Sequence, residues 1–300
     1  MNNKTIATIC LGVFASTGAL AQNFTDARIE TQQLGDGMHV LFGVGDGVIA
    51  GNMLVAIGAD GVFVVDDQFP EMVPKFRQTI VDLGGGAIDF VVNTHWHFDH
   101  ADGNKVLGPD GVTIAAHDNS RRMLMQDNSI NLVNQVIEQP QFDEQARPAL
   151  SFGNTMSFHF NDEQIDLAHF GPAHTMGDSA VFFRDSNVVH LGDVFNNAGF
   201  PFIDADNGGS LNGVISFCSA VLEQLPRTAI VVPGHGPVSD YQGLSDYVEM
   251  LSEIRDRLSA MMSSGATLEQ VMAAEIAAEW TDSHGDPTML LDRAYASMLP

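Results

Sequence analysis

Three histidines and an aspartate lie within six positions, in the segment HWHFDH at residues 95–100. The segment follows IDFVVNT, a short apolar run with the composition of a buried strand. On an extended chain alternate side chains point the same way, so His95 and His97 can share one metal ion. Asp99 and His100 come next, on a turn, where they can reach a second ion. Imidazole and carboxylate ligands suit Zn²⁺, and two metal ions ~3.5–4 Å apart are typical of hydrolytic sites.

One loop cannot close two metal sites, so the cluster predicts further ligands elsewhere in the chain. Three candidates come at or just beyond the ends of apolar strands, and each has glycine nearby: His174, Asp193 and His235. Glycine-bearing loops give the backbone the freedom to direct such side chains into a common cleft. We expect these residues to meet the HWHFDH segment in the folded chain.

The elements that position these residues follow from the apolar pattern. In the first half, strands are predicted at MHVLFGV, NMLVAIG, GVFVVDD, IDFVVNT and VTIAA, with helices over residues 70–83 and 119–138. In the second half, strands are predicted at TMSFHF, QIDLAHF, SAVFFRD, NVVHLGD and AIVVPGHG, with a helix over residues 213–225 and two or three helices from residue 242 onward. This order predicts one compact α/β unit with two similar halves packed face to face.

The chain has 300 residues, of which 45% are hydrophobic, enough for a substantial core. It carries 13 Lys and Arg against 38 Asp and Glu, a formal net charge of −25. So negative a surface repels phosphate groups, which argues against nucleic acid and anionic membranes as partners. A small-molecule substrate is the expected partner, and the sequence gives no indication of oligomeric state.

The N-terminus has the organisation of a signal peptide. Lys4 supplies positive charge, ATICLGVFASTGAL is an apolar stretch of suitable length, and Ala19-Leu20-Ala21 is an A-x-A cleavage site. The alternative, a membrane anchor, needs ~20 apolar residues, more than this run offers. We therefore expect cleavage after Ala21, a periplasmic or secreted protein, and a single domain over residues 22–300 with a helical segment at about 242–300. The mature chain keeps one cysteine, Cys218, in an apolar run, and so has no internal disulfide.

Taken together, the chemistry-bearing segments resemble the metallo-β-lactamase superfamily. Five elements occur in that family's order over about residues 35–240: Asp66 in VFVVDD, HWHFDH, His174, Asp193, and Gly234-His235-Gly236. The resemblance implies an α/β fold, a four-layer αββα sandwich with a dizinc site at the edge between its two sheets.

The resemblance also implies how the ligands divide between two Zn²⁺ ions per chain. The first ion would be held by His95, His97 and His174. The second would be held by Asp99, His100 and His235. Asp193 matches the aspartate that bridges both ions in the glyoxalase II and lactonase branches of the family. Asp66 is expected to accept a hydrogen bond from a ligand histidine and fix its tautomer, and His117, which ends a strand near the site, is a candidate for a similar supporting role.

These ligands predict a mechanism. A hydroxide held between the two ions is expected to attack a carbonyl carbon and cleave a C–O, C–S or C–N bond. Asp99 is the expected catalytic residue, because it can orient that hydroxide and carry its proton. No G-x-S-x-G motif occurs, and Cys218 has no histidine near it in sequence, so no rival nucleophile is indicated.

The substrate is expected to be a small neutral ester, lactone, thioester or lactam. Two loops, 43–52 and 195–210, should border the cleft, and residues 194–226 contain no Lys or Arg to bind the carboxylate of a β-lactam. Asn196 and Asn197 are candidates for donating hydrogen bonds to a carbonyl oxygen. Phe200 and Phe202 are candidates for apolar substrate contacts, with core packing as the alternative for both.

Three alternatives remain open at this stage. The chain could be a metallo-β-lactamase with weak β-lactam hydrolysis. It could instead be a periplasmic metal-dependent accessory or relay protein for a quinoprotein system. A third possibility, an oxygen-reducing diiron protein, also needs a bridging aspartate, but such proteins usually carry a flavin-binding domain and none is indicated after residue 240.

Overall fold

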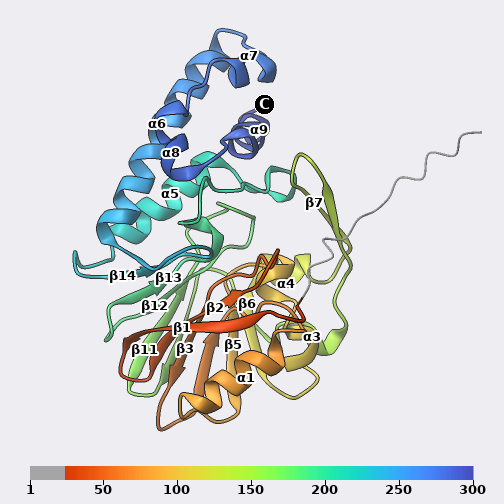
Figure 1. Ribbon diagram of the computed structural model, residues 1–300, viewed down its shortest axis with the longest axis vertical. Helices are drawn as coiled ribbons and strands as arrows, with labels where there is room; N and C mark the ends of the chain where they lie inside the picture. Colours follow the sequence, from red (N-terminus) through yellow and green to blue (C-terminus); the bar gives the residue numbers. More distant parts are fainter. Residues whose placement is uncertain (1–23, 300) are drawn as a thin grey trace, which may run out of the picture.

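Two β-sheets pack face to face, and helices cover the outer face of each (Figure 1). The computed structural model describes residues 24–299, so the expected signal peptide and its cleavage site lie outside the described residues. Within residues 24–299 no helix combines the length and the hydropathy needed to cross a membrane. The layers form the αββα sandwich that the sequence predicts.

The first sheet contains seven strands in the order β1-β2-β3-β4-β5-β6-β9. Their bounds are β1 (Arg28–Gly35), β2 (Met38–Val44), β3 (Met53–Ile57), β4 (Val62–Val65), β5 (Ile88–Asn93), β6 (Thr113–His117) and β9 (Leu150–Phe152). Strands β1 to β4 pair antiparallel, whereas β4, β5, β6 and β9 pair parallel. The carboxyl ends of these parallel strands therefore lie along one edge of the sheet.

The second sheet contains six strands in the order β10-β11-β12-β13-β14-β15. Their bounds are β10 (Thr155–Phe160), β11 (Glu163–Ala168), β12 (Ala180–Phe183), β13 (Val188–His190), β14 (Ile230–Val232) and β15 (Ser239–Asp240). Only β13 and β14 pair parallel. The residues that follow these two strands therefore emerge at the same edge.

The central core lies between the sheets and is rich in valine and phenylalanine. Phe63 on β4 is fully buried there, with its ring centroid 5.2 Å from that of Phe158 and 6.0 Å from that of Phe183 on the opposite sheet. Outside the first sheet lies α1 (Val73–Asp82), which buries Val73, Phe76 and Ile80. Outside the second sheet lie α5 (Leu211–Leu222), α6 (Tyr241–Ser263) and α9 (Thr288–Ser297).

Local sequence rules set the ends of these helices. The side chains of Ser210 and Asp240 accept hydrogen bonds from the amides of Gly213 and Gly243, which caps the first turns of α5 and α6. Gly84 follows α1 with φ of +92°, a conformation that favours glycine and stops the helix. The predicted helical tail is present as α6, α7 (Leu268–Ala273), η4 (Ala278–Trp280), α8 (Thr281–His284) and α9.

The prediction of one helix over residues 119–138 is wrong. The chain forms a short helix, α4 (Asp118–Met123), followed by an antiparallel hairpin of β7 (Asn128–Asn131) and β8 (Val136–Gln139). The Asn128 side chain donates to the carbonyls of Met123 and Gln126, and this interaction competes with continuation of the helix. The hairpin instead buries Ile130 opposite Ile137 in a small cluster with Trp96.

The remaining short elements connect the layers: α2 (Phe98–Ala101), α3 (Asn104–Leu107), η1 (Glu144–Ala146), η2 (Gly192–Val194) and η3 (Ala205–Asn207). Two of them, α2 and η2, carry predicted metal ligands.

Candidate metal centre

The HWHFDH segment begins just beyond the carboxyl end of β5. The chain bends at Thr94 and His95, so the fully extended stretch expected from the spacing does not form, but His97 has extended backbone angles (φ −64°, ψ 149°) and α2 begins at Phe98. The rings of His95 and His97 nevertheless meet, with centroids 4.8 Å apart, and Asp99 and His100 lie on the first helical turn.

The other half of the site comes from the second sheet. His174 lies in the loop between β11 and β12, Asp193 lies in η2 after β13, and His235 follows β14. Because β13 and β14 are parallel neighbours, the last two arrive together, and the Gly234 amide donates to the carbonyl of Gly192 at 2.8 Å. A β-carbon at Gly234 would lie 2.0 Å from Asp193 Oδ1, so this approach requires glycine.

All seven predicted ligands meet at this edge in two groups. One group consists of His95, His97 and His174, and the other of Asp99, His100, Asp193 and His235, with the ligand atoms of each group within 4.8 Å of one another. His97 Nδ1 lies 2.9 Å from His174 Nε2, and His100 Nε2 lies 3.2 Å from His235 Nε2. Two nitrogens bound to one tetrahedral Zn²⁺ at the usual bond length are about 3.3 Å apart, close to both values.

Asp193 faces both groups. Its Oδ1 lies 3.0 Å from His100 Nε2 and 3.4 Å from His235 Nε2, whereas its Oδ2 lies 3.7 Å from His174 Nε2. The two oxygens of this one carboxylate are thus directed to different ligand groups, an arrangement suited to a bridging ligand.

The residues fit two Zn²⁺ ions. The donor set is entirely imidazole nitrogen and carboxylate oxygen, which Zn²⁺ prefers. His95 Nε2 is buried and has no hydrogen-bond partner among the described residues, which is costly for a polar atom unless an ion takes that place.

Electrostatics distinguishes the two groups. Burial lowers the pKa of His95 well below its ordinary value and that of His174 to about 4, and neighbouring histidines add to both effects. Burial also opposes protonation of His235, but the Asp193 and Asp99 carboxylates outweigh it and raise the pKa to about 10. His95 and His174 are therefore neutral imidazoles, the form that binds metals, and the second group attracts positive charge.

Hydrogen bonds hold three of the predicted ligand histidines from behind. Asp66 Oδ2 lies 2.7 Å from His100 Nδ1 and accepts from the Thr94 hydroxyl at 2.8 Å, and that hydroxyl lies 3.1 Å from His95 Nδ1. Asp66 thus contacts His100, one of the predicted ligands. The carbonyl of Phe202 lies 2.9 Å from His174 Nδ1.

Asp204 was missed by the sequence reasoning. Its Oδ2 lies 2.9 Å from His97 Nε2, both side chains are buried, and Asn207 donates to both carboxylate oxygens at 2.9 Å. The only signal in the sequence is the acidic character of FIDADNGG, which does not distinguish Asp204 from Asp206.

The loop over residues 43–52 closes against the second ligand group. The Gly51 amide donates to the carbonyl of Asp99 at 3.1 Å, and the Gly51 carbonyl accepts from the Gln68 side chain at 2.7 Å. A β-carbon at Gly51 would lie only 2.3 Å from the nearest atom of the His100 ring. This position therefore needs glycine for His100 to keep its place.

Two other predicted residues do not reach the ligands. His117 Nε2 bonds the carbonyl of Gly153 at 2.7 Å, and its ring stacks on His169 with centroids 3.8 Å apart. Phe200 is buried in the core beneath the C-terminal helices, so of the two alternatives for this residue the structure shows core packing.

Phe202 and the two asparagines lie nearer. The Phe202 ring centroid is 5.7 Å from that of His174 and 6.1 Å from that of His97. The backbone of Asn196 forms an isolated β-bridge with that of His235, but the Asn196 Oδ1 accepts a hydrogen bond from the Ala198 amide. Asn197 Nδ2 donates to the carbonyl of Pro237 at 2.8 Å. The Asn197 amide group is therefore already engaged within the protein.

Comparisons with known proteins agree with this fold. The chain is similar to a metallo-beta-lactamase from Pontibacter korlensis, with a TM-score of 0.60, 16% identity, and coverage of 75% of this chain and 99% of that one. It is also similar to DIM-1 metallo-beta-lactamase (TM-score 0.60, 18% identity, coverage 75% and 97%) and to TMB-1 (TM-score 0.59, 20% identity, coverage 75% and 97%). At these identities the likeness concerns the fold alone.

No curated protein matches the chain. The family model described as "Metallo-beta-lactamase superfamily" matches residues 46–235, which include every predicted ligand. With the αββα sandwich and the two ligand groups at its edge, the chain belongs to the metallo-β-lactamase superfamily.

Proposed function

We propose that the chain is a dizinc hydrolase that cleaves a carbonyl C–O, C–S or C–N bond in a small ester, lactone, thioester or lactam. The observation that carries the proposal is the meeting of two ligand groups at one edge of the sandwich, with Asp193 facing both. The chain's membership of a superfamily whose members are generally hydrolases supports the same reaction class.

The ligand roles follow from the grouping. His95, His97 and His174 would hold one Zn²⁺. Asp99, His100 and His235 would hold the other, and Asp193 would bridge the two ions. When bound, the ions would polarise the scissile carbonyl and lower the pKa of a water molecule so that it can attack near neutral pH.

The protein groups orient the reactants around this centre. Asp99 Oδ2 lies 3.1 Å from His235 Nε2, and the side chains of Asp99, Asp193 and His235 are 11%, 13% and 16% exposed. These three side chains therefore form the part of the site that substrate and water can reach. Asp99 has the position and the carboxylate needed to orient a water molecule and accept its proton.

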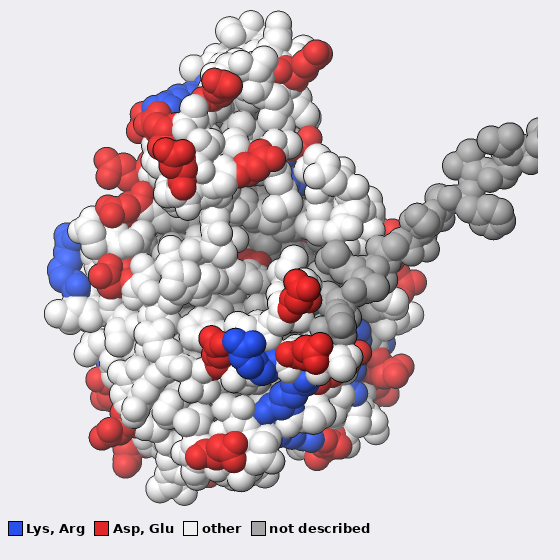
Figure 2. All heavy atoms as spheres, viewed as in Figure 1, with Lys and Arg blue, Asp and Glu red and all other residues white. Residues whose placement is uncertain are grey.

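The charge distribution favours neutral substrates. Figure 2 shows acidic side chains spread over the face in view, with few lysines and arginines between them. The absence of Lys and Arg from residues 194–226 leaves that wall of the site without a cation for a substrate carboxylate. A β-lactam, which carries a carboxylate, is therefore expected to be a weaker substrate than a neutral ester or lactone.

We further propose that the protein works in the periplasm or outside the cell, after cleavage of a signal peptide following Ala21.

A hydrolysis panel run beside elemental analysis tests the proposal. The purified protein should contain two zinc ions per chain and hydrolyse at least one of an ester, a lactone, a thioester and a chromogenic cephalosporin. His235→Ala should reduce the zinc content and abolish hydrolysis. His284→Ala, which changes a histidine in the helical tail, should keep the zinc content and the activity of the parent protein. Fewer than two ions, or iron in place of zinc, would refute the dizinc site. A fully loaded protein inactive on every substrate would favour an accessory or relay role, and a preference for the cephalosporin would favour a β-lactamase.

A further inference from the structure

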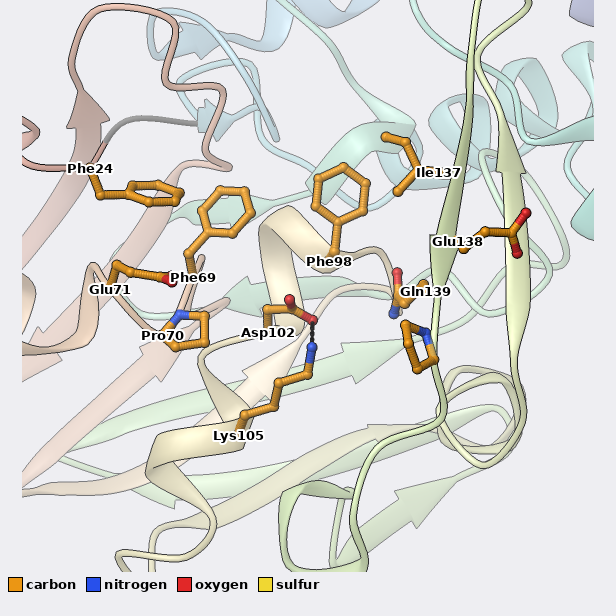
Figure 3. A pocket seen from close by; sticks show the side chains of 11 residues that line it. Phe24, Phe69, Pro70, Glu71, Phe98, Asp102, Lys105, Ile137, Glu138 and Gln139 are labelled. Atoms are coloured by element: carbon orange, nitrogen blue, oxygen red, sulfur yellow. Dashed lines mark hydrogen bonds and ion pairs between the residues drawn. The ribbon is translucent and has the colours of Figure 1, made fainter. Parts of the chain in front are cut away.

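A cavity of about 260 Å³ opens beside the HWHFDH segment (Figure 3). Residues from four separate segments line it: Phe24, Phe69, Pro70, Glu71, Phe98, Asp102, Lys105, Ile137, Glu138, Gln139 and Pro140. None of the predicted ligands is among them, so the cavity lies next to the candidate metal centre and not within it.

Three phenylalanines form a continuous aromatic wall. The Phe69 ring centroid lies 4.9 Å from that of Phe24 and 5.9 Å from that of Phe98, and Figure 3 shows the three rings in a row with Ile137 beyond them. Phe24 and Phe98 are half-buried, so part of each ring stays accessible. A wall of this kind offers an aromatic guest both apolar area and edge-to-face ring contacts.

The cavity and the candidate metal centre draw residues from the same chain segment. Phe98 stands between His97 and Asp99, so its Cα lies about 3.8 Å from the Cα of each of these predicted ligands. On the other side of the cavity, Gln139 donates to the carbonyl of Trp96 at 2.8 Å, which fixes the β8 wall to the same segment. Phe98 and Gln139 thus connect two walls of the cavity to the chain segment that carries four of the predicted ligands.

The charges around the cavity disfavour an anionic guest. Lys105 is the only lysine or arginine among the described lining residues, and its ammonium is already paired with Asp102 at 2.7 Å. Glu71 is exposed at the rim, and Glu138, also exposed, points away from the space in Figure 3. The unpaired charge facing a guest is thus negative, which disfavours a carboxylate and tolerates a neutral or cationic group.

We propose that this cavity binds an aromatic group of the substrate, and that the substrate is a neutral or cationic aryl-bearing ester, lactone, thioester or amide. The size agrees, because an apolar cavity of about 150 Å³ holds a benzene molecule and this cavity has room for a substituted ring. The inference rests on the proposed function for the reaction, but the binding of the ring does not depend on catalysis.

Binding is tested first, without any reaction. Benzyl alcohol, which is neutral, and benzylamine, which is cationic at pH 7, should each give saturable NMR shifts with the zinc-loaded protein. Phe98→Leu and Phe24→Ala should each raise the dissociation constant at least fivefold. Phe170→Leu changes a half-buried phenylalanine that packs against the apolar cluster beneath α5 and α6, and it should leave the dissociation constant unchanged. No saturable binding, or equal constants in all three variants, overturns the proposal.

Hydrolysis then tests the substrate class. Methyl phenylacetate and benzyl acetate place the ring on the acyl or the alcohol side, and methyl acetate lacks it. At least one aryl ester should exceed methyl acetate in kcat/KM by tenfold or more, and Phe98→Leu should reduce that ratio. Equal rates on all three esters refute the aromatic preference while leaving the hydrolase intact. If neither these esters nor any member of the hydrolysis panel reacts but the ring still binds, the proposed function fails and the cavity assignment stands.

Discussion

Replacing Asp204 with asparagine tests whether a buried carboxylate fixes a metal ligand. Asp204 Oδ2 lies 2.9 Å from His97 Nε2, and the two side chains are only 1% and 4% exposed. Burial works against the charged form of Asp204, but the bonds from His97 and Asn207 outweigh it and lower the pKa of the carboxyl group. A charged acceptor behind His97 holds Nδ1 toward His174 and makes the ring a better ligand.

The size of the effect follows from that geometry. Asparagine keeps the shape of the side chain but removes its charge, and its amide group would meet the Asn207 amide, which now donates to both carboxylate oxygens. Loss of such a partner typically weakens metal binding 10- to 100-fold, or about 1.4 to 2.7 kcal/mol. We therefore expect Asp204→Asn to weaken zinc binding at the histidine group by that factor.

The assay is a competition for zinc against a chromophoric chelator, with far-UV circular dichroism to confirm the fold. Asp110→Asn is the control, because Asp110 is half exposed and pairs with Arg77, which is not a predicted ligand. The control should bind zinc like the parent protein. An affinity of Asp204→Asn within threefold of the parent would show that the carboxylate does not orient His97.

Three further predictions follow from the same structure. Gly51→Ala should lower the zinc content from two ions per chain toward one, because the new β-carbon would lie 2.3 Å from the His100 ring. Gly86→Ala, whose β-carbon would meet nothing within 4 Å, should keep both ions. Equal zinc content in the two variants would contradict this prediction. Burial, and further the neighbouring His169, lower the pKa of His117 to about 4, so between pH 4 and 6.5 the unfolded chain binds more protons than the folded one. The free energy of unfolding should therefore fall as the pH drops through that range, by up to about 3 kcal/mol. Urea titrations at several pH values should show a weaker pH dependence for His117→Gln. Phe63→Ala should lower the free energy of unfolding, measured in urea, by about 3–5 kcal/mol. A loss below about 1 kcal/mol would mean that neighbouring side chains move into the cavity left by the ring.

Most of the sandwich could be predicted because its strands are short apolar runs with glycine at their ends. The strands before Asp66, His95, Asp193 and His235 all form where the pattern places them, and their parallel pairing brings these residues to one edge. The hairpin at residues 128–139 could not be predicted in the same way. Its apolar residues, such as Val133 and Ile137, are four apart and match a helix, and the strand pairing depends on burial against Trp96, which is distant in sequence.

The ligands could be predicted for a related reason. Histidines and aspartates at strand ends carry a chemical signal that does not depend on knowing their neighbours. His117 carried the same signal and ends β6 beside β5, yet its ring stacks on His169, which follows β11 of the opposite sheet. A strand end thus predicts the edge at which a residue lies, but not the direction of its side chain.

Asp204 shows what a local pattern cannot contain. The η3 segment that directly follows it is held from two sides, since Asn207 donates to the carbonyl of Ser129 in β7 and Arg293 in α9 pairs with Asp206 at 3.0 Å. Arg293 lies beyond residue 235, where the family match ends. The ligands themselves follow from short motifs, but the carboxylate behind His97 is positioned by a hairpin and a tail helix that become its neighbours only after folding. The tail is thereby connected to the metal centre, and changes at Arg293 should reach His97 through this loop.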